Sequence, residues 1–298
     1  MSGGSVSSGS VSSGSVSGTG SGHAPTSSDP APSDGPVLWE DVGDGVVRVL
    51  LNRPQRLNAY TPALCRQLRE ALDRYDRDDT LRALILTGTG RGFCAGGDIG
   101  GDDPEQQREL TGQLGRAQNL KHDFHALALD LLRLDKPVIA AVNGAAVAGG
   151  LTLALLCDIR VAAASARLGD TSGRVGLLPD EGGAWLFPRV MGYDNALRMI
   201  ALHEVYDAAR ALELNLVTEV VADDALADHT LALARRFAAQ APLTVRVTKR
   251  LLRDALSSGF EQSLSNAAMA VMVVNTSEDA TEGIQAFREK RPPHFIGR

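Results

Sequence analysis

The sequence predicts an α/β fold with a parallel sheet, followed by a helical C-terminal region. Three observations support this prediction: apolar strand-like runs alternate with helical patterns from residue 46 to 163, two of those runs lead into Gly-rich turns, and the pattern after Gly192 is mostly helical. Alternating strands and helices are typical of parallel strands joined by right-handed crossovers. With 298 residues, 44% of them apolar, the chain is long enough to bury a large core.

The N-terminal segment, residues 1–36, differs in composition from the rest. It is made of Ser, Gly, Pro and Thr with scattered Val, and Gly-Ser-Val-Ser-Ser recurs through Gly18. Such a segment buries too little apolar surface to offset the entropy of ordering it. We therefore predict a disordered tail over 1–36, an α/β core over 37–222 and a helical region over 223–298.

The core is expected to begin with a hairpin and a helix. The two strand-like runs at 37–40 and 46–51 flank Asp44-Gly45, a strong turn pair. Thr61 followed by Pro62 is a typical helix start, with a hydroxyl cap and a proline in the first turn. Helical spacing then predicts a buried face made of Leu64, Leu68, Ala71, Leu72 and Tyr75.

Two strand-to-helix turns dominate the middle of the chain. Residues 138–142 form an apolar run typical of a buried strand; small residues follow at 145–150, and 151–156 is too apolar for an exposed helix. The strand at 81–87 leads in the same way into the Gly-rich stretch 88–98. Free backbone N–H groups at such turns bind anions or developing negative charge. Two turns of this kind can supply one N–H each to a single carbonyl oxygen.

The second half of the chain is expected to be largely helical. Pro104 is expected to open a helical stretch whose apolar face continues to Leu134. Short strands are predicted at 159–163 and 216–221, and amphipathic helices at 225–239, 242–256, 260–275 and 277–288.

Charge and composition exclude several classes of partner. The net charge is −6 with acids and bases interspersed, which does not favour nucleic-acid binding. No apolar run reaches the ~18 residues of a membrane span, and no secretory signal pattern opens the chain. The cysteines Cys65, Cys94 and Cys157 are few, odd in number and without metal-like spacing. We therefore expect a cytoplasmic protein without a metal, a membrane or a nucleic-acid partner.

Several segments resemble those of a known family. Phe-Cys-Ala-Gly-Gly-Asp-Ile at 93–99 and Asn-Gly-Ala-Ala-Val-Ala-Gly-Gly at 143–150 resemble the two signature segments of the enoyl-CoA hydratase/isomerase (crotonase) family. Residues 51–59, 176–183 and 286–291 are similar to its first CoA-binding segment, third active-site segment and C-terminal helix. The resemblance covers 37–298 in order. It implies a crotonase-like spiral β/α core whose C-terminal helices make trimer contacts, often in a dimer of trimers.

The resemblance also implies the substrate and the binding residues. The substrate would be a coenzyme A thioester, with no separate cofactor. The backbone N–H groups of Ala95 and Gly149 would bind the thioester oxygen, and Asp98 would organise its loop. The matched CoA and acyl positions are Arg56, Leu57, Ala59, Gly97, Asp98, Ile99, Thr152, Ser172, Phe287 and Lys290. Of these, Phe287 and Lys290 match positions that reach the nucleotide of a neighbouring subunit.

This chain departs from the family's hydratases at two positions. The hydratases use two glutamates to activate and protonate water, and the matching residues here are Thr152 and Ser172. Neither side chain is a general base near neutral pH. The departure argues against water addition by the two-glutamate route.

Asp180 matches a carboxylate that family isomerases use to move a proton between carbons. One carboxylate is sufficient for shifting a double bond, because it takes a proton from one carbon and returns it to another. Burial near acyl chains would raise its pKa toward neutrality. The alternative is that Asp180 caps the helix starting near Gly182. The adjacent Glu181 is expected to point elsewhere.

The leading hypothesis is an enoyl-CoA isomerase that shifts a 3-ene to a 2-ene through an enolate. Hydratase activity is one alternative. Hydrolysis, decarboxylation or ring chemistry on a specialised CoA thioester is another, and His122 or His125 would then act as a base. An alternative of a different class is a non-catalytic acyl-CoA-binding subunit with the Gly/Ser tail as a tether.

Overall fold

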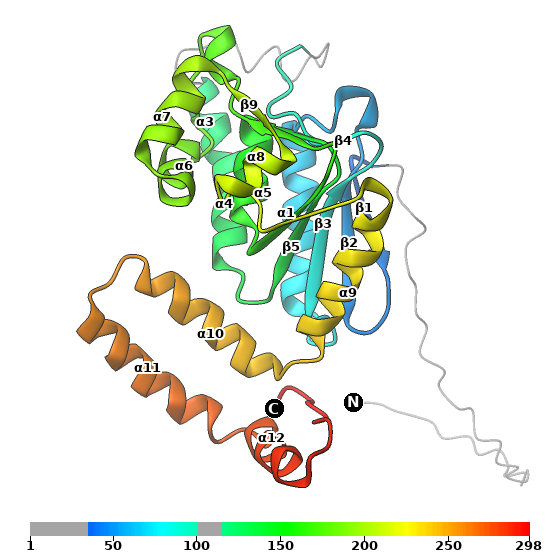
Figure 1. Cartoon of the computed structure of the whole chain (residues 1–298), viewed down its shortest axis with the longest axis vertical. Coiled ribbons are helices and arrows are strands. Elements are labelled where there is room, and N and C mark those ends of the chain that lie inside the picture. Colours follow the sequence, from blue (N-terminus) through cyan, green and yellow to red (C-terminus); the bar gives the residue numbers. More distant parts are fainter. Residues whose placement is uncertain (1–34, 101–114) are drawn as a thin grey trace, which may run out of the picture. The chain divides into compact units, whose positions relative to one another are not determined.

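The computed structural model describes residues 35–100 and 115–298 (Figure 1). The described residues belong to one compact unit. Residues 1–34 of the expected tail and the expected helix start at Pro104 lie outside the described residues. The last two residues of the tail, Gly35 and Pro36, accept hydrogen bonds from Asn52, so the prediction of disorder was wrong there. The boundary expected between residues 222 and 223 stays a prediction.

The larger sheet has the strand order β1-β2-β3-β5-β7-β10, and most of these strands lie side by side in Figure 1. The first two strands form the expected hairpin, with Val37 opposite Leu51, and every later pair in this sheet is parallel. The predicted parallel α/β fold is therefore confirmed. The strands are β1 (Val37–Asp41), β2 (Val46–Leu51), β3 (Ala83–Gly88), β5 (Val138–Val142), β7 (Ile159–Ala163) and β10 (Glu219–Val221).

A smaller sheet, which the sequence analysis did not predict, carries the Gly-rich turns. Its order is β4-β6-β8-β9, with β4, β6 and β8 parallel and β9 antiparallel to β8. The strands are β4 (Gly92–Cys94), β6 (Ala145–Val147), β8 (Arg167–Gly169) and β9 (Val205–Asp207). Each has three residues, too few for the alternation of apolar and polar residues that marks a strand.

Helices cover the sheets where the apolar periodicity predicted them. The helix α1 begins as expected, because the Thr61 side chain accepts a hydrogen bond from the Leu64 N–H and Pro62 occupies the first turn. Every residue of α5 is buried, as its composition indicated. In the core, α9 packs on β3 and β5. The helices here are α1 (Pro62–Arg77), α3 (Gly115–His122), α4 (Phe124–Arg133), α5 (Gly149–Leu156), α6 (Gly183–Met191), α7 (Tyr193–Leu202), α8 (Ala208–Glu213) and α9 (Leu226–Ala238).

Three further helices complete the C-terminal region, close to their predicted bounds: α10 (Pro242–Ala255), α11 (Phe260–Val274) and α12 (Glu278–Glu289). Single turns of 3-10 helix lie at Pro54–Arg56, Ser172–Val175 and Asp223–Ala225. Within the two described ranges, no helix is long and apolar enough to cross a membrane.

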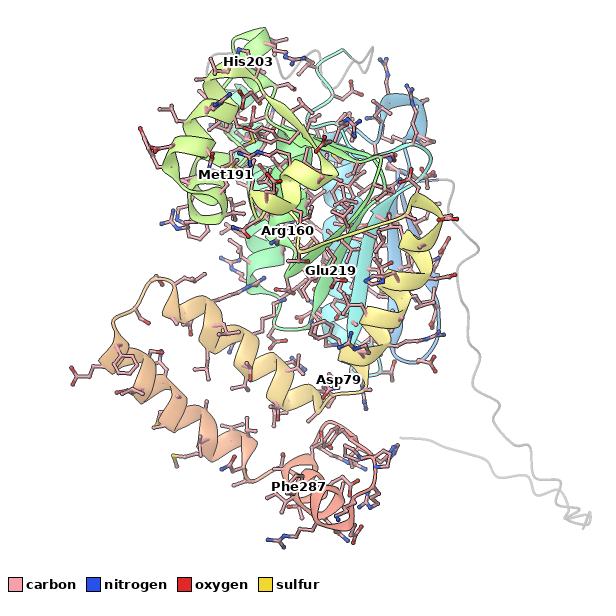
Figure 2. The ribbon with its side chains drawn as sticks, viewed as in Figure 1. Asp79, Arg160, Met191, His203, Glu219 and Phe287 are labelled. Carbon is pink, nitrogen blue, oxygen red and sulfur yellow. The ribbon has the colours of Figure 1, made fainter. Side chains whose placement is uncertain are left out.

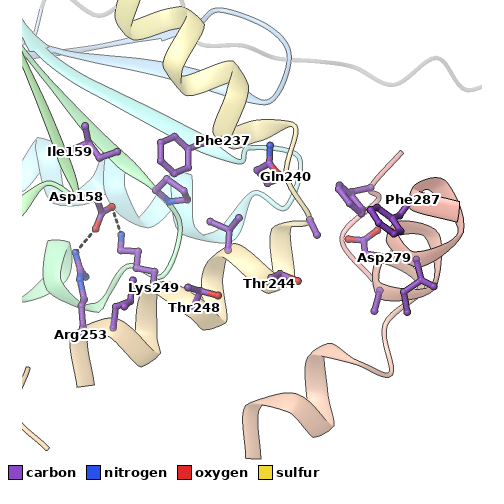
Figure 3. A pocket seen from close by; sticks show the side chains of 18 residues that line it. Asp158, Ile159, Phe237, Gln240, Thr244, Thr248, Lys249, Arg253, Asp279 and Phe287 are labelled. Carbon is purple, nitrogen blue, oxygen red and sulfur yellow. Dashed lines mark hydrogen bonds and ion pairs between the residues drawn. The ribbon is translucent and has the colours of Figure 1, made fainter. Parts of the chain in front are cut away.

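Asp158 connects the central strand to α10. Its carboxylate accepts the N–H of Val138, the first residue of β5, at 2.8 Å. From α10, the Lys249 ammonium lies 2.6 Å from one carboxylate oxygen and the Arg253 guanidinium 2.9 Å from the other (Figure 3). The Lys249 side chain is only 10% exposed. One carboxylate therefore contacts both the start of β5 and two cations of α10, beside a second ion pair between Arg246 of α10 and Asp135.

We expect Asp158→Ala to lower the free energy of unfolding by about 3–5 kcal/mol, because it leaves a buried ammonium without its acid. Asp73→Ala is the matched control: Asp73 pairs with Arg77 one helical turn away, and both side chains are mostly exposed. That exposed pair contributes only about 0.5 kcal/mol. Urea denaturation of both variants measures the difference. Equal losses in the two variants would contradict the anchoring role of Asp158.

Candidate active site

The two Gly-rich turns lie in contact with each other. Gly96, after β4, has φ +88°, and a Cβ built on it would lie 3.0 Å from the Cβ of Ala148 and 3.4 Å from the N atom of Gly149. A Cβ on Gly150 would lie 1.9 Å from the carbonyl oxygen of Cys94, so no side chain fits there. The glycines thus allow the two main chains to approach each other, as expected for a shared site.

Ala148, the residue before α5, has a strained backbone. Its φ of 50° and ψ of −127° lie in a region that residues other than glycine rarely occupy. The conformation is held by the smaller sheet, where the Ala148 N–H donates to the carbonyl of Gly169 at 3.0 Å. Strain of this kind concentrates at active sites.

The amide groups of the turns correct one expectation. The Ala95 N–H donates to the carbonyl of Leu57 at 3.0 Å, so it is not available to a ligand, and its expected role in binding the thioester oxygen is wrong. Among the described residues, the N–H groups of Gly97 and Gly149 have no acceptor. The first turn therefore offers Gly97, two residues further on. Residue spacing does not show which amide in a turn is unpaired, because this depends on the backbone dihedral angles.

Tyr60 and Asp98 fix the shape of the first turn. The Tyr60 N–H donates a hydrogen bond to the carbonyl oxygen of Gly96 at 2.8 Å, and the Tyr60 carbonyl oxygen accepts one from the Asp98 N–H at 3.0 Å. The Asp98 carboxylate is 5% exposed and lies 2.7 Å from the guanidinium of Arg53, which also donates to the carbonyl of Ala59. Asp98 organises its loop, as expected.

A pocket of about 410 Å³ opens beside these turns. It contains six of the predicted site residues: Ala95, Gly97, Asp98, Ile99, Ser172 and Asp180. The other lining residues are Tyr60, Pro62, Asn119, Leu120, Asp123, Phe124, Ala148, Thr171, Val175, Leu177, Leu178 and Glu181. The lining includes apolar side chains of α3, α4 and the loop before α6, and acids from three places: Asp98 after β4, Asp123 between α3 and α4, and Asp180 and Glu181 before α6.

Some predicted binding residues lie outside this pocket. Arg56 is exposed, Leu57 is half-buried and Ala59 is buried, all on the loop after β2. Thr152 is fully buried in α5, and its hydroxyl has no hydrogen-bond partner among the described residues. The structure therefore does not bring these four side chains to the pocket surface.

The two C-terminal candidates lie on and just after α12. Phe287 lies on α12 (Figure 2). Its side chain is 85% exposed, and Lys290 is the C-cap residue that follows the helix. Phe287 lines a second cavity, of about 820 Å³, together with Asp158 and residues of α10 (Figure 3). Within one chain, neither residue lines the pocket beside the glycine turns.

Asp180 lies on the wall of the site pocket, partly exposed, just before α6. The cap residue of α6 is Gly182, and no side chain caps this helix. The alternative that Asp180 is a helix cap is therefore wrong. The Nε2 atom of His125, on α4, lies 2.7 Å from the carbonyl oxygen of Asp180. This contact holds the backbone of Asp180 next to α4.

Glu181 points into the site, contrary to expectation. Its Oε1 accepts a hydrogen bond from the Tyr60 hydroxyl at 2.7 Å, and a Cβ on Gly149 would lie 2.6 Å from the same oxygen. Burial raises the pKa of Glu181 to about 7; the Tyr60 hydrogen bond lowers this pKa and the charge of Asp180 raises it. Sequence reasoning missed this residue because loop geometry decides which of two adjacent acids faces inward.

The buried cysteines show no sign of reactivity. Burial raises the pKa of the Cys94 thiol to about 12, and that of Cys157 likewise to about 12, which disfavours a nucleophilic thiolate. Among the described residues, no group of His, Cys, Asp and Glu side chains is arranged to hold a metal ion.

Comparison with known proteins supports the resemblance in sequence. The family model described as enoyl-CoA hydratase/isomerase matches residues 41–298. The chain is 38% identical to 1,2-epoxyphenylacetyl-CoA isomerase of Escherichia coli over 88% of this chain and 98% of the relative. It is 34% identical to (E)-benzylidenesuccinyl-CoA hydratase of Thauera aromatica over 88% of this chain and 99% of the relative.

The fold agrees with the sequence match. An enoyl-CoA hydratase structure from Bacillus anthracis aligns with a TM-score of 0.83 and 31% identity, covering 88% of this chain and all of the other. The parallel strands, the paired glycine turns and the C-terminal helices are thus those of a crotonase fold. The chain belongs to the enoyl-CoA hydratase/isomerase family of acyl-CoA enzymes.

Proposed function

We propose that this protein is an enoyl-CoA isomerase that shifts a 3-ene to a 2-ene through an enolate. One observation carries the proposal: the N–H groups of Gly97 and Gly149 have no acceptor among the described residues, and Asp180 lines the pocket beside the two turns. In this proposal, the two amides hold the thioester oxygen and Asp180 moves the proton.

The chemistry requires such an arrangement. Removing a proton next to a thioester moves negative charge onto the carbonyl oxygen. Two preorganised N–H donors stabilise this enolate more than the neutral substrate, and the differential stabilisation lowers the barrier. The substrate is the CoA thioester itself, and the proposal includes no separate cofactor.

The residues around the pocket favour isomerisation over hydration. Ser172 lines the pocket and Thr152 is buried behind it, so neither family glutamate position holds a carboxylate that would activate water. A double-bond shift fixes no water and needs only proton transfer. The E. coli relative is named an isomerase of 1,2-epoxyphenylacetyl-CoA, which supports isomerisation of a CoA thioester but names an epoxide and not a 3-ene as the substrate.

Other relatives carry the names of hydratases, so hydration is the first competing function. Hydrolysis or decarboxylation of a specialised CoA thioester is the second, and the position of His125 beside the Asp180 backbone is the observation that favours it. A non-catalytic acyl-CoA-binding subunit is the third.

An assay of 2-enoyl-, 3-enoyl- and 3-hydroxyacyl-CoA in deuterated water separates these functions. The isomerase is expected to convert 3-enoyl-CoA to 2-enoyl-CoA with deuterium incorporated at carbon and without forming 3-hydroxyacyl-CoA. Hydration of 2-enoyl-CoA without any isomerisation, or release of free CoA, would contradict the proposal. Binding without exchange or conversion would identify a non-catalytic subunit.

We also propose that the chain assembles as a homotrimer or a dimer of trimers in the cytoplasm. The support is a set of large apolar side chains exposed on α10, α11 and α12, which a partner surface would cover. They include Leu252, Phe260, Met269, Met272 and Phe287. Light scattering of the purified protein measures the assembly. The three free, buried cysteines fit a reducing compartment.

A further inference from the structure

Tyr60 and Glu181 form a fixed pair at the two glycine turns. The Tyr60 backbone is hydrogen-bonded to the first turn on both sides, and its ring packs against Phe124 with 4.7 Å between ring centroids. Its hydroxyl donates to Oε1 of Glu181 at 2.7 Å. A Cβ on Gly97 would lie 3.2 Å from that hydroxyl. The first turn therefore determines where the Glu181 carboxyl lies.

The second carboxyl oxygen of Glu181 accepts no hydrogen bond among the described residues, and the neighbouring Asp180 side chain raises the pKa of this carboxyl. The side chain is 6% exposed, lines the pocket, and its Oε2 has no hydrogen-bond partner among the described residues. A buried carboxylate oxygen without a partner is costly, and accepting a proton relieves that cost. The three atoms nearest a Cβ on Gly149 belong to Glu181 and Tyr60, so this carboxyl lies beside the Cα of Gly149.

We propose that Glu181 is a second proton carrier of this site, positioned by Tyr60, and that it acts on the carbon next to the thioester while Asp180 acts at the far end of the double bond. The inference rests on the proposed isomerase function. The carbon next to the thioester is one bond from the carbonyl carbon whose oxygen Gly97 and Gly149 hold. The carboxyl that adjoins Gly149 is therefore well placed to reach this carbon.

The proton transfers balance. Oε2 of the Glu181 carboxylate takes the proton from C2: the C–H bond breaks, an O–H bond forms, and the electron pair moves onto the thioester oxygen as a dienolate. Protonated Asp180 gives its proton to C4, and the electron pair returns to form the 2-ene. The proton on Glu181 then passes to Asp180, which restores the starting state. Glu181 becomes neutral as the enolate forms, so the net charge of the pocket stays constant.

In this proposal the pair carries one proton. Burial and the charge of Asp180 raise the pKa of Glu181 to about 7, so Glu181 gains and loses a proton near neutral pH. The pKa of the Tyr60 hydroxyl is raised by burial and by Glu181, so Tyr60 remains a donor. Among the described residues, the other titratable or charged groups near the pair are Asp98 with its partner Arg53, Asp123, His125 and the buried thiols of Cys65 and Cys94.

Exchange of the C2 hydrogens of a saturated thioester, butanoyl-CoA, in deuterated water isolates the first transfer. We expect Glu181→Gln to slow this exchange about a hundredfold or more. Glutamine keeps the size of the side chain and an oxygen for Tyr60, so the fold is expected to persist. Asp180→Asn is expected to keep C2 exchange while losing isomerisation of 3-enoyl-CoA. Nuclear magnetic resonance follows both reactions.

The pH profile distinguishes a positioning role of Tyr60 from a structural one. The ionised form of Glu181 is the base, so exchange rises with pH through its pKa. Tyr60→Phe removes a hydrogen bond that lowers the pKa of Glu181, so the midpoint of the rise is expected to move to higher pH. Tyr206→Phe is the matched control, because Tyr206 donates to Glu204 at 2.8 Å outside the pocket. Its midpoint is expected to stay at the wild-type pH.

The outcomes separate this inference from the proposed function. Wild-type exchange and an unshifted midpoint in Glu181→Gln would overturn the role of Glu181. If C2 exchange depends on Glu181 but 3-enoyl-CoA is not converted, the isomerase function fails and the role of Glu181 in C2 proton transfer stands.

Discussion

Gly97→Pro is expected to lower turnover of 3-enoyl-CoA by about 100- to 1,000-fold, the effect of losing one preorganised oxyanion donor. Proline removes the Gly97 N–H, which makes no hydrogen bond within the described structure. The hydrogen bonds that hold this turn belong to Gly96 and Asp98, and both remain available. Steady-state rates, with circular dichroism to verify folding, measure the effect.

Gly97→Ala is the control for Gly97→Pro. Alanine adds the same Cβ, which would lie 3.2 Å from the Tyr60 hydroxyl, but it keeps the N–H. We expect its turnover to stay much closer to wild type than that of the proline variant. Equal losses in both variants would show that the added carbon, and not the missing donor, causes the defect. Gly149 is less suitable for this comparison, because a Cβ there would lie 2.6 Å from Glu181.

Asp180→Asn is expected to lower the rate of isomerisation about a hundredfold or more, because an amide does not exchange protons with carbon. Acyl-CoA affinity is expected to change little, since no hydrogen bond from the Asp180 side chain caps α6 and the substitution keeps the shape of the side chain. Titration calorimetry with a saturated acyl-CoA measures the affinity separately from the rate.

Asp194→Asn provides the matched change of charge for Asp180→Asn. Asp194 lies in the first turn of α7, outside the pocket, and loses one negative charge in the same way. The control is expected to retain wild-type turnover. A near-normal rate in Asp180→Asn would remove Asp180 from the mechanism, and the remaining proton transfer would then have to come from Glu181.

The large parallel sheet and its helices could be predicted from the sequence because the spacing of their apolar residues shows which residues are buried. Val138–Val142 and the fully buried helix Gly149–Leu156 are the clearest cases. The three-residue strands of the smaller sheet were not predicted, because Ala145–Val147 is too short to show alternation. Their order depends on pairing between distant segments, which a local pattern does not contain.

The sequence predicted which segments form the candidate site, but not which of their amide and carboxyl groups face the pocket. The contact between the glycine turns followed from their small residues, and the Gly149 N–H has no acceptor among the described residues, so its role as a donor stays a prediction. The choice of Ala95 over Gly97 was wrong because hydrogen bonding to Leu57 decides which amide is used. Glu181 was dismissed because the sequence does not reveal that Tyr60, 121 positions away, binds its carboxyl. Both errors concern hydrogen bonds between loops, which only the folded structure determines.

Because Asp158 contacts both β5 and α10, the protein is not expected to tolerate truncation before α10. The Asp158 carboxylate accepts a hydrogen bond from the first N–H of β5 and forms ion pairs with two cations of α10. Removing the C-terminal helices would leave this carboxylate without its two counter-ions. It would also expose Pro137, Ile159 and Phe237, which line the cavity next to α10. A fragment that ends before α10 is therefore expected to aggregate and not to melt as an independent domain. The core and the C-terminal region should instead lose their structure in one cooperative transition.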